Sequence, residues 1–131
     1  MNRLYEIGLK ESDVKNMIDA CSVIIEMEDE EVENKINILK QIGCKDVHIK
    51  NILICNPWYL DRLDKDVLKL IDTLLKNKFE CIHLLIDANP FILNLDSFEI
   101  EQYIKNKQAE GMELEDIVDE LDANPILFQE M

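Results

Sequence analysis

Basic and aromatic side chains gather near the middle of the chain, in an arrangement that could hold nucleic acid. Lys65 and Lys69 are four residues apart, so a helix would place both on one face. Trp58 and Tyr59 precede them closely. Lysine and arginine neutralise phosphates while aromatic rings stack on bases, and this combination is typical of sites that hold single strands. The candidate nucleic-acid contacts are Lys65, Lys69, Lys40 and Arg62.

The other reactive side chains form no pattern typical of catalysis. His48 and His83 fall on polar positions of their segments, where we expect them at the surface. Ser12, Ser22 and Ser97 occupy capping or turn positions, so no Ser–His–Asp set has support. Three glycines are too few for a phosphate-binding loop. We therefore expect no catalytic residue, no cofactor and no enzymatic activity.

Acidic residues dominate residues 26–33. A calcium-binding loop needs oxygen ligands at set spacings around a central glycine, and this run lacks both. Carboxylates in the first turn of a helix are stabilised by the helix dipole. The run is thus expected to begin a helix, with contact to a basic partner as the alternative. We expect no metal site here, nor at the pair Asp119 and Asp122.

Four segments of the chain repeat one pattern. Its end is marked by Ser22, Pro57, Pro90 and Pro125, at steps of 35, 33 and 35 residues. Fourteen residues before these marks lie Gly8, Gly43, Lys76 and Gly111. Two landmarks with a shared spacing predict a helical solenoid, a class of protein that mostly binds other molecules. The expected units are residues 3–36, 37–71, 72–106 and 107–131, within a single domain of residues 1–131.

Each unit is expected to hold two helices joined by a short helical turn. Apolar residues at helical spacing predict a first helix of about ten residues, with Ser12 and Asp46 as N-caps in the first two units. Asn-Pro pairs begin the short turn, because Asn caps a helix and Pro suits its first position. Second helices are expected at Asp29–Ile42, Asp64–Leu75 and Ser97–Gln108. Leu68, Leu75 and Phe98 are expected on their buried apolar faces. Gly8 and Gly43 suit the position just after a helix end. The fold class is all-α, a right- or left-handed superhelical solenoid of about three and a half repeats, with no sheet.

The cysteines at 21, 44, 55 and 81 include no CxxC pair, which disfavours zinc or redox chemistry. Cys55 stands where the other units have Ala, and Cys44 where they have Leu9 and Met112. These positions favour a small or apolar residue, so we expect structural thiols.

The four units differ in net charge. The net charge is −14, and the four units carry −6, +2, −3 and −7 in chain order. A chain this acidic repels phosphate at long range, whereas nucleic-acid binders usually present a basic face. No stretch is long and apolar enough for a membrane span, and the N-terminus lacks the features of a targeting segment. We expect a cytoplasmic protein.

The repeat resembles that of the mTERF family, the mitochondrial transcription termination factors. That motif is approximately Leu-x-x-x-Gly, then a helix rich in Ile or Leu, then Pro-x-x-Leu. Here it runs from Leu39 and Gly43 through Ile49 and Leu53 to Pro57 and Leu60. The other units match less fully, with Gly8, Gly111, Pro90 and Pro125 at the defining positions. The resemblance implies units of two helices and a short helix, stacked in a superhelix, and a nucleic-acid-binding role in organelles.

Two functions follow from these observations. The first is a non-enzymatic module that binds a protein, either a basic partner or a second copy of the chain. The second is nucleic-acid binding or transcription-related regulation by analogy with the mTERF family. They differ over Trp58, because packing of Trp58 and Tyr59 between units favours the first and exposure of Trp58 favours the second.

Overall fold

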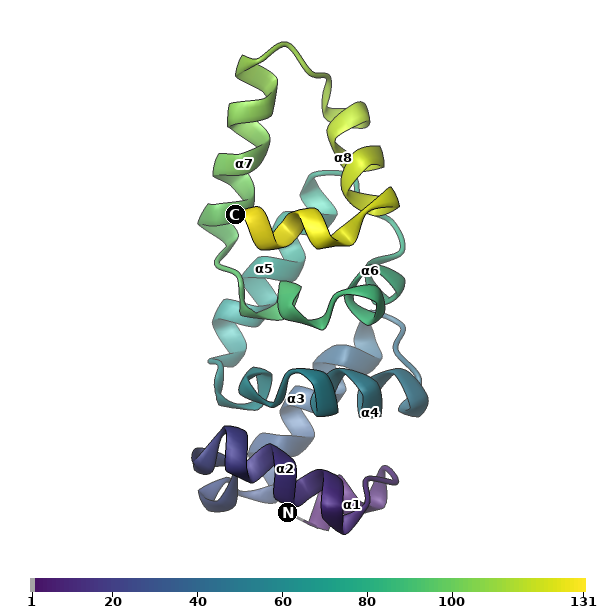
Figure 1. The fold of residues 1–131 in the computed structure, drawn as a ribbon, viewed down its shortest axis with the longest axis vertical. Coiled ribbons are helices and arrows are strands. Elements are labelled where there is room, and N and C mark those ends of the chain that lie inside the picture. Colours follow the sequence, from purple (N-terminus) through teal and green to yellow (C-terminus); the bar gives the residue numbers. More distant parts are fainter. Residues whose placement is uncertain (1) are drawn as a thin grey trace. The chain divides into compact units, whose positions relative to one another are not determined.

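The computed structural model describes residues 2–131, and these contain helices and turns but no strand. The predicted all-α repeat is therefore confirmed, while the handedness of a superhelix stays a prediction. By its internal contacts the chain divides into two compact units, Met1–Asp64 and Lys65–Met131 (Figure 1). Within the described residues, every helix is too short or too polar to cross a membrane.

In the first compact unit, equivalent helices of the two successive repeats pack directly against each other. Helix α1 packs on α3, α2 packs on α4, and the two 3-10 helices η1 and η2 contact each other. Its core contains Ile24, Ile36, Leu39 and Leu53, none of them accessible to solvent. The elements are α1 (Asn2–Glu6), α2 (Glu11–Ala20), η1 (Ser22–Glu26), α3 (Asp29–Gln41), α4 (Asp46–Cys55) and η2 (Pro57–Asp61).

The second compact unit ends in a helical hairpin, whose arms α7 and α8 lie side by side (Figure 1). The last 3-10 helix, η4, turns back from α8 and contacts η3. It carries Phe128, which is fully buried with its ring centroid 5.9 Å from that of Phe79. The elements are α5 (Asp64–Lys76), α6 (Ile82–Ala88), η3 (Pro90–Asn94), α7 (Ser97–Ala109), α8 (Leu114–Ala123) and η4 (Pro125–Glu130).

Helices α1, α3, α5 and α7 all end in the same way. After α3, the N–H of Gly43 donates to the carbonyl of Lys40 and the N–H of Cys44 to that of Leu39. This pair of bonds is the Schellman motif, and it needs a residue with positive φ. Gly8, Gly43 and Gly111 supply it with φ of 103°, 107° and 98°. In the third repeat the residue is Lys78, with φ of 73°, so the prediction that Lys76 is equivalent to these glycines is wrong.

The short turns after the Asn-Pro pairs are 3-10 helices, and this corrects the expected position of Trp58. A 3-10 helix has three residues per turn, so neighbouring side chains point in different directions. Tyr59 and Leu60 are buried, whereas Trp58 is 45% exposed. The equivalent residues of the other repeats are also exposed: Val23, Phe91 and Ile126. The predicted packing between repeats therefore holds for Tyr59 but not for Trp58.

Tyr59 connects η2 to α3. Its hydroxyl donates to the carbonyl of Lys35 at 2.7 Å, and the buried ammonium of Lys35 pairs with Asp64 at 2.5 Å. Burial raises the pKa of the Tyr59 phenol far above its ordinary value, and the charges of Asp64 and Cys44 act in the same direction. The phenol therefore remains protonated and is a permanent hydrogen-bond donor.

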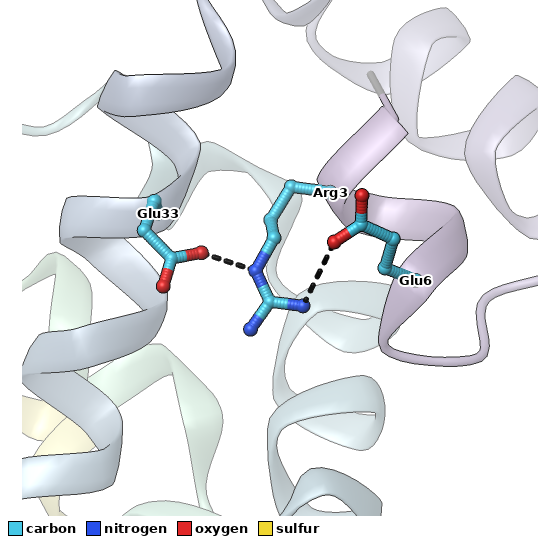
Figure 2. Close-up of polar contacts among 3 residues, drawn as sticks. All are labelled: Arg3, Glu6 and Glu33. Carbon is cyan, nitrogen blue, oxygen red and sulfur yellow. Dashed lines mark hydrogen bonds and ion pairs between the residues drawn. The ribbon is translucent and has the colours of Figure 1, made fainter.

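The acidic run begins α3, as predicted. Asp29, Glu30 and Glu31 occupy the first turn, and the Glu31 carboxylate accepts from the N–H of Glu28 at 3.3 Å. Glu33 pairs with Arg3 of α1, which also lies 3.6 Å from Glu6 (Figure 2). The run therefore serves helix capping and a contact between α1 and α3.

Several details differ from the sequence-based expectations. The N-caps of α2 and α4 are Lys10 and Lys45 rather than Ser12 and Asp46. Their N–H groups donate instead to side chains three residues on, Asp13 and His48. The three second helices match their predicted ranges within one residue, but Leu68, Leu75 and Phe98 are exposed rather than buried.

Candidate functional site

The predicted basic contacts are divided between the two compact units. Lys40, on α3, and Arg62, after η2, belong to the first unit. Lys65 and Lys69 belong to the second, where both are exposed and share a face of α5. The same helix carries an ion pair of opposite charges, Lys76 with Asp72 at 3.0 Å. The structure thus confirms the shared face of Lys65 and Lys69, and it gives α5 a mixed rather than a purely basic surface.

A groove of about 700 Å³ lies in the second unit between α6 and α8. It contains none of the predicted basic contacts. Its lining comes from the loop before α6, from one face of α6 and from the facing side of α8. The residues are Lys78, Glu80, Cys81, Leu84, Leu85, Ala88, Leu114, Glu115, Val118, Asp119, Asp122 and Pro125. The volume falls in the range of about 300–1,000 Å³ that is usual for binding sites.

A shortened helix accounts for the opening. Helix α6 has 7 residues, whereas the corresponding helices α2, α4 and α8 each have 10. In the first unit, α2 packs directly on α4, and the side chain of Lys50 lies close over Gly8. In the second unit, α6 lacks its first turn, and Lys78 stands in the place of Gly8 while Val118 stands in that of Lys50. The space filled in one unit is left open in the other.

The groove has an apolar floor. Leu85 and Val118 are 4% and 5% exposed, and they form its base. Leu84 stands at the edge with 53% of its surface exposed, although it is a large apolar residue. Leu114 and Pro125 are half-buried at the two ends of α8. An open trough with an apolar base and one exposed leucine favours the burial of another apolar surface against it.

The rim of the groove is acidic. Glu80, Glu115, Asp119 and Asp122 are exposed, and Lys78 is the one basic residue of the lining. Burial raises the pKa of the Asp122 carboxyl above its ordinary value, and the negative charges of Asp119 and Glu80 raise it further. These carboxylates repel one another, so a positive group placed among them would be stabilised. Within residues 2–131 no three His, Cys, Asp or Glu side chains form a group that could hold a metal ion.

Exposed thiols modify the expectation for the cysteines. Cys21 and Cys44 are buried, as expected for structural thiols. Cys55 and Cys81 are exposed, so the expected role as structural thiols packed into the fold does not hold for these two. Cys81 is the N-cap of the short α6 and lines the groove.

Sequence reasoning did not find the groove, although two signals for it are present. The step between the second and third repeat marks is 33 residues instead of 35, and the last repeat carries a charge of −7. The first signal shows that one repeat is shorter than its neighbours. The second shows that carboxylates gather on α8, where three of the four rim carboxylates lie.

Comparison with known proteins agrees with the repeat structure. The mTERF family model matches residues 1–127 of the 131-residue chain. No curated protein matches it. The family is one of helical-repeat proteins, generally without enzymatic activity, and its members usually bind nucleic acid. This match over nearly the whole length, together with the repeated Schellman and Asn-Pro landmarks, shows that the chain belongs to the mTERF family.

Proposed function

We propose that this chain is a non-enzymatic mTERF-type repeat module that binds a protein partner with a basic surface. The observation that carries the proposal is the groove between α6 and α8, which joins an apolar floor to a rim of four carboxylates and one ammonium. Apolar area supplies the affinity of such a contact, while charge selects the partner and speeds its capture.

The charge of the second unit supports a basic partner over an acidic one. Residues 65–131 contain 6 lysines and 15 aspartates or glutamates, a net charge of −9. Such a surface attracts cationic proteins at long range and repels nucleic acid. It also opposes contact between two copies of this unit, so a basic partner is favoured over self-association.

The test is direct binding of the wild-type chain to basic probes. We would label Lys- and Arg-rich peptides and measure their fluorescence anisotropy with the protein at about 50 mM and about 200 mM salt, since charge attraction is screened over about 10 Å at 0.1 M. Acidic peptides of the same length serve as the control. Binding of the basic probes alone, weakening with salt, is the expected result. Equal binding of acidic and basic probes, or none of either, would contradict the proposal.

Nucleic-acid binding is the second candidate, and the exposure of Trp58 is the observation that favours it. An exposed tryptophan can stack on a base, and each such stack contributes about 1–3 kcal/mol. The test is titration of single-stranded and duplex DNA and RNA at the same two salt concentrations. Quenching of Trp58 emission and loss of binding in the double variant Lys65→Glu, Lys69→Glu would establish this function. Tight binding that persists in the double variant would place the contact elsewhere.

A further inference from the structure

We infer that the groove between α6 and α8 receives an amphipathic helix of the partner protein, with an apolar stripe flanked on one side by lysine or arginine. This inference rests on the proposed function and specifies the site and the chemistry of the partner. It follows from the shape of the groove, the spacing of its apolar residues and the placement of its charges.

Residues of two helices, α6 and α8, form the walls. On α6 the lining residues Leu84, Leu85 and Ala88 recur at helical spacing, and on α8 so do Leu114 and Val118. A trough between two helices presents apolar side chains at the period of 3.6 residues, and a third helix can place its own side chains between them. In the first unit the same position is closed by contact of α2 with α4.

The exposed leucine argues for an occupant rather than an empty trough. Leu84 is 53% exposed beside Leu85 and Val118, which are buried. Fully burying a leucine side chain contributes about 1.5–3 kcal/mol, so covering Leu84 adds a part of that. A helix laid in the groove would cover Leu84 together with Leu114 and Pro125.

The carboxylates are arranged along one wall. Glu115, Asp119 and Asp122 lie on α8 at steps of four and three residues, which forms a single stripe on that helix. On the opposite side Glu80 is accompanied by Lys78, so that side is close to neutral. The partner helix is therefore expected to carry its cations on the flank that faces α8. Because only one side of the groove is strongly acidic, a docked helix needs its cations on one flank. Non-specific electrostatic attraction to the acidic chain has no such requirement.

A designed peptide tests the inference in the full-length chain. The probe is a labelled helix of about 18 residues, or five turns, with leucine at helical spacing and lysine or arginine on one flank. A peptide of the same composition, scrambled to remove the periodicity, is the matched control. We expect the amphipathic peptide to bind at least about tenfold more tightly by anisotropy at about 50 mM salt, a difference of about 1.4 kcal/mol. Equal binding of the two peptides would overturn the docked helix, while salt-sensitive binding of both would still support a basic partner.

Matched variants locate the contact. Asp119→Lys reverses a charge in the groove and Glu30→Lys makes the same change on α3; both residues are exposed. Leu84→Ser removes the exposed leucine, and Ile126→Ser removes an exposed apolar residue outside the lining. We expect the two groove variants to weaken binding about three- to tenfold or more and the two controls by less than about twofold.

The pattern of loss separates the two proposals. If Glu30→Lys weakens binding and Asp119→Lys does not, the groove is not the site, although the chain still binds a basic partner. If neither peptide nor any other basic probe binds the wild type at about 50 mM salt, both proposals fail. Circular dichroism melts of each variant show whether the fold is retained, and all four substituted residues are exposed, so the fold is expected to survive.

Discussion

Replacing Lys78 with glycine is expected to stabilise the protein. Lys78 is the non-glycine residue with positive φ among the described residues, and it occupies the position that Gly8, Gly43 and Gly111 hold in the other repeats. Its backbone is held at a φ of 73° because the N–H groups of Lys78 and Phe79 close the end of α5, on the carbonyls of Leu75 and Leu74. A side chain at such a φ crowds its own backbone, and glycine removes the crowding without breaking either bond.

The expected gain follows from two opposing terms. Left-handed backbone costs an ordinary residue about 1–2 kcal/mol, which Lys78→Gly recovers. Glycine has more conformational freedom in the unfolded chain, and this lowers the gain in stability by about 0.4–1 kcal/mol. The free energy of unfolding should therefore rise by about 0.5–1 kcal/mol, a shift in Tm of about 2–4 °C for a chain of 131 residues.

The assay is urea denaturation of the wild type and variants, followed by circular dichroism. Lys78→Ala is the control, because it removes the ammonium and the stem but keeps the backbone strain. Gly111→Ala is the mirror experiment: Gly111 has φ of 98° and an added Cβ would meet no atom within 4 Å, so its expected loss is purely conformational. If Lys78→Gly is no more stable than Lys78→Ala, the repeated helix end does not select glycine, and the reasoning fails.

Three further substitutions test separate parts of the fold and site. Tyr59→Phe removes the hydroxyl that donates to the Lys35 carbonyl and should lower the free energy of unfolding by about 0.5–1.5 kcal/mol in urea denaturation; an unchanged midpoint would show that the bond adds nothing. Phe128→Ala empties a fully buried site against Phe79 and should cost about 3–5 kcal/mol, seen as a large fall in Tm, whereas a small fall would mean that η4 is weakly held. Because the folded-state pKa of Asp122 is raised, its ionisation opposes folding above that pKa, and the penalty disappears as pH falls below the unfolded-state value. Asp122→Asn should therefore be slightly more stable than the wild type near pH 7, by less than about 1 kcal/mol for this exposed group, and should lose that advantage in acid; a gain that persists in acid would exclude the charge as its cause.

The repeat could be predicted from the sequence because its landmarks have a local physical cause. Pro57, Pro90 and Pro125 each occupy the first position of a 3-10 helix, where the missing N–H costs nothing. Gly43 and Gly111 each follow a helix end that needs positive φ. Such requirements depend on a residue and its neighbours alone, so spacing was sufficient to place the elements and to predict an all-α fold.

Exposure was harder to predict, because it depends on what packs against each face. Trp58 and Tyr59 are adjacent and both aromatic, yet one is 45% exposed and the other is fully buried. The difference comes from the direction in which a 3-10 helix presents each side chain to α3, which hydrophobicity does not reveal. Leu75 likewise continues the apolar pattern of α5 but is 55% exposed. Helical periodicity predicted which residues share a face of each helix. It did not predict how much of that face is buried by neighbouring elements.

Lys78 also shows why the groove was not predicted. A fixed spacing of 14 residues from Pro90 gives Lys76 as the counterpart of the glycines. That alignment assumes that the two residues by which the third repeat is shorter are missing before the end of α5. The hydrogen bonds that close α5 show instead that the two residues are missing after the end of α5. The spacing from Lys78 to Pro90 is 12 residues, whereas the spacing from Gly43 to Pro57 is 14. The buried pair Leu74 and Phe79 keeps the same spacing as Leu39 and Cys44, and this was the sequence signal for the correct alignment.

The loss of two residues explains why the second unit has a groove where the first has a packed interface. Removing two residues within a helix would turn everything beyond them by about 200°, because each residue advances an α-helix by about 100°. That rotation would take Ile82, Leu85 and Ile86 out of the core, yet all three are buried. The helix has instead kept its register with Pro90 and given up its first turn, so α6 begins at Ile82 with Cys81 as its N-cap. In the first unit α2 packs directly on α4, whereas in the second unit the missing turn of α6 leaves part of α8 uncovered. The acidic wall of α8 and the apolar floor are therefore open because of a change in the chain's own period.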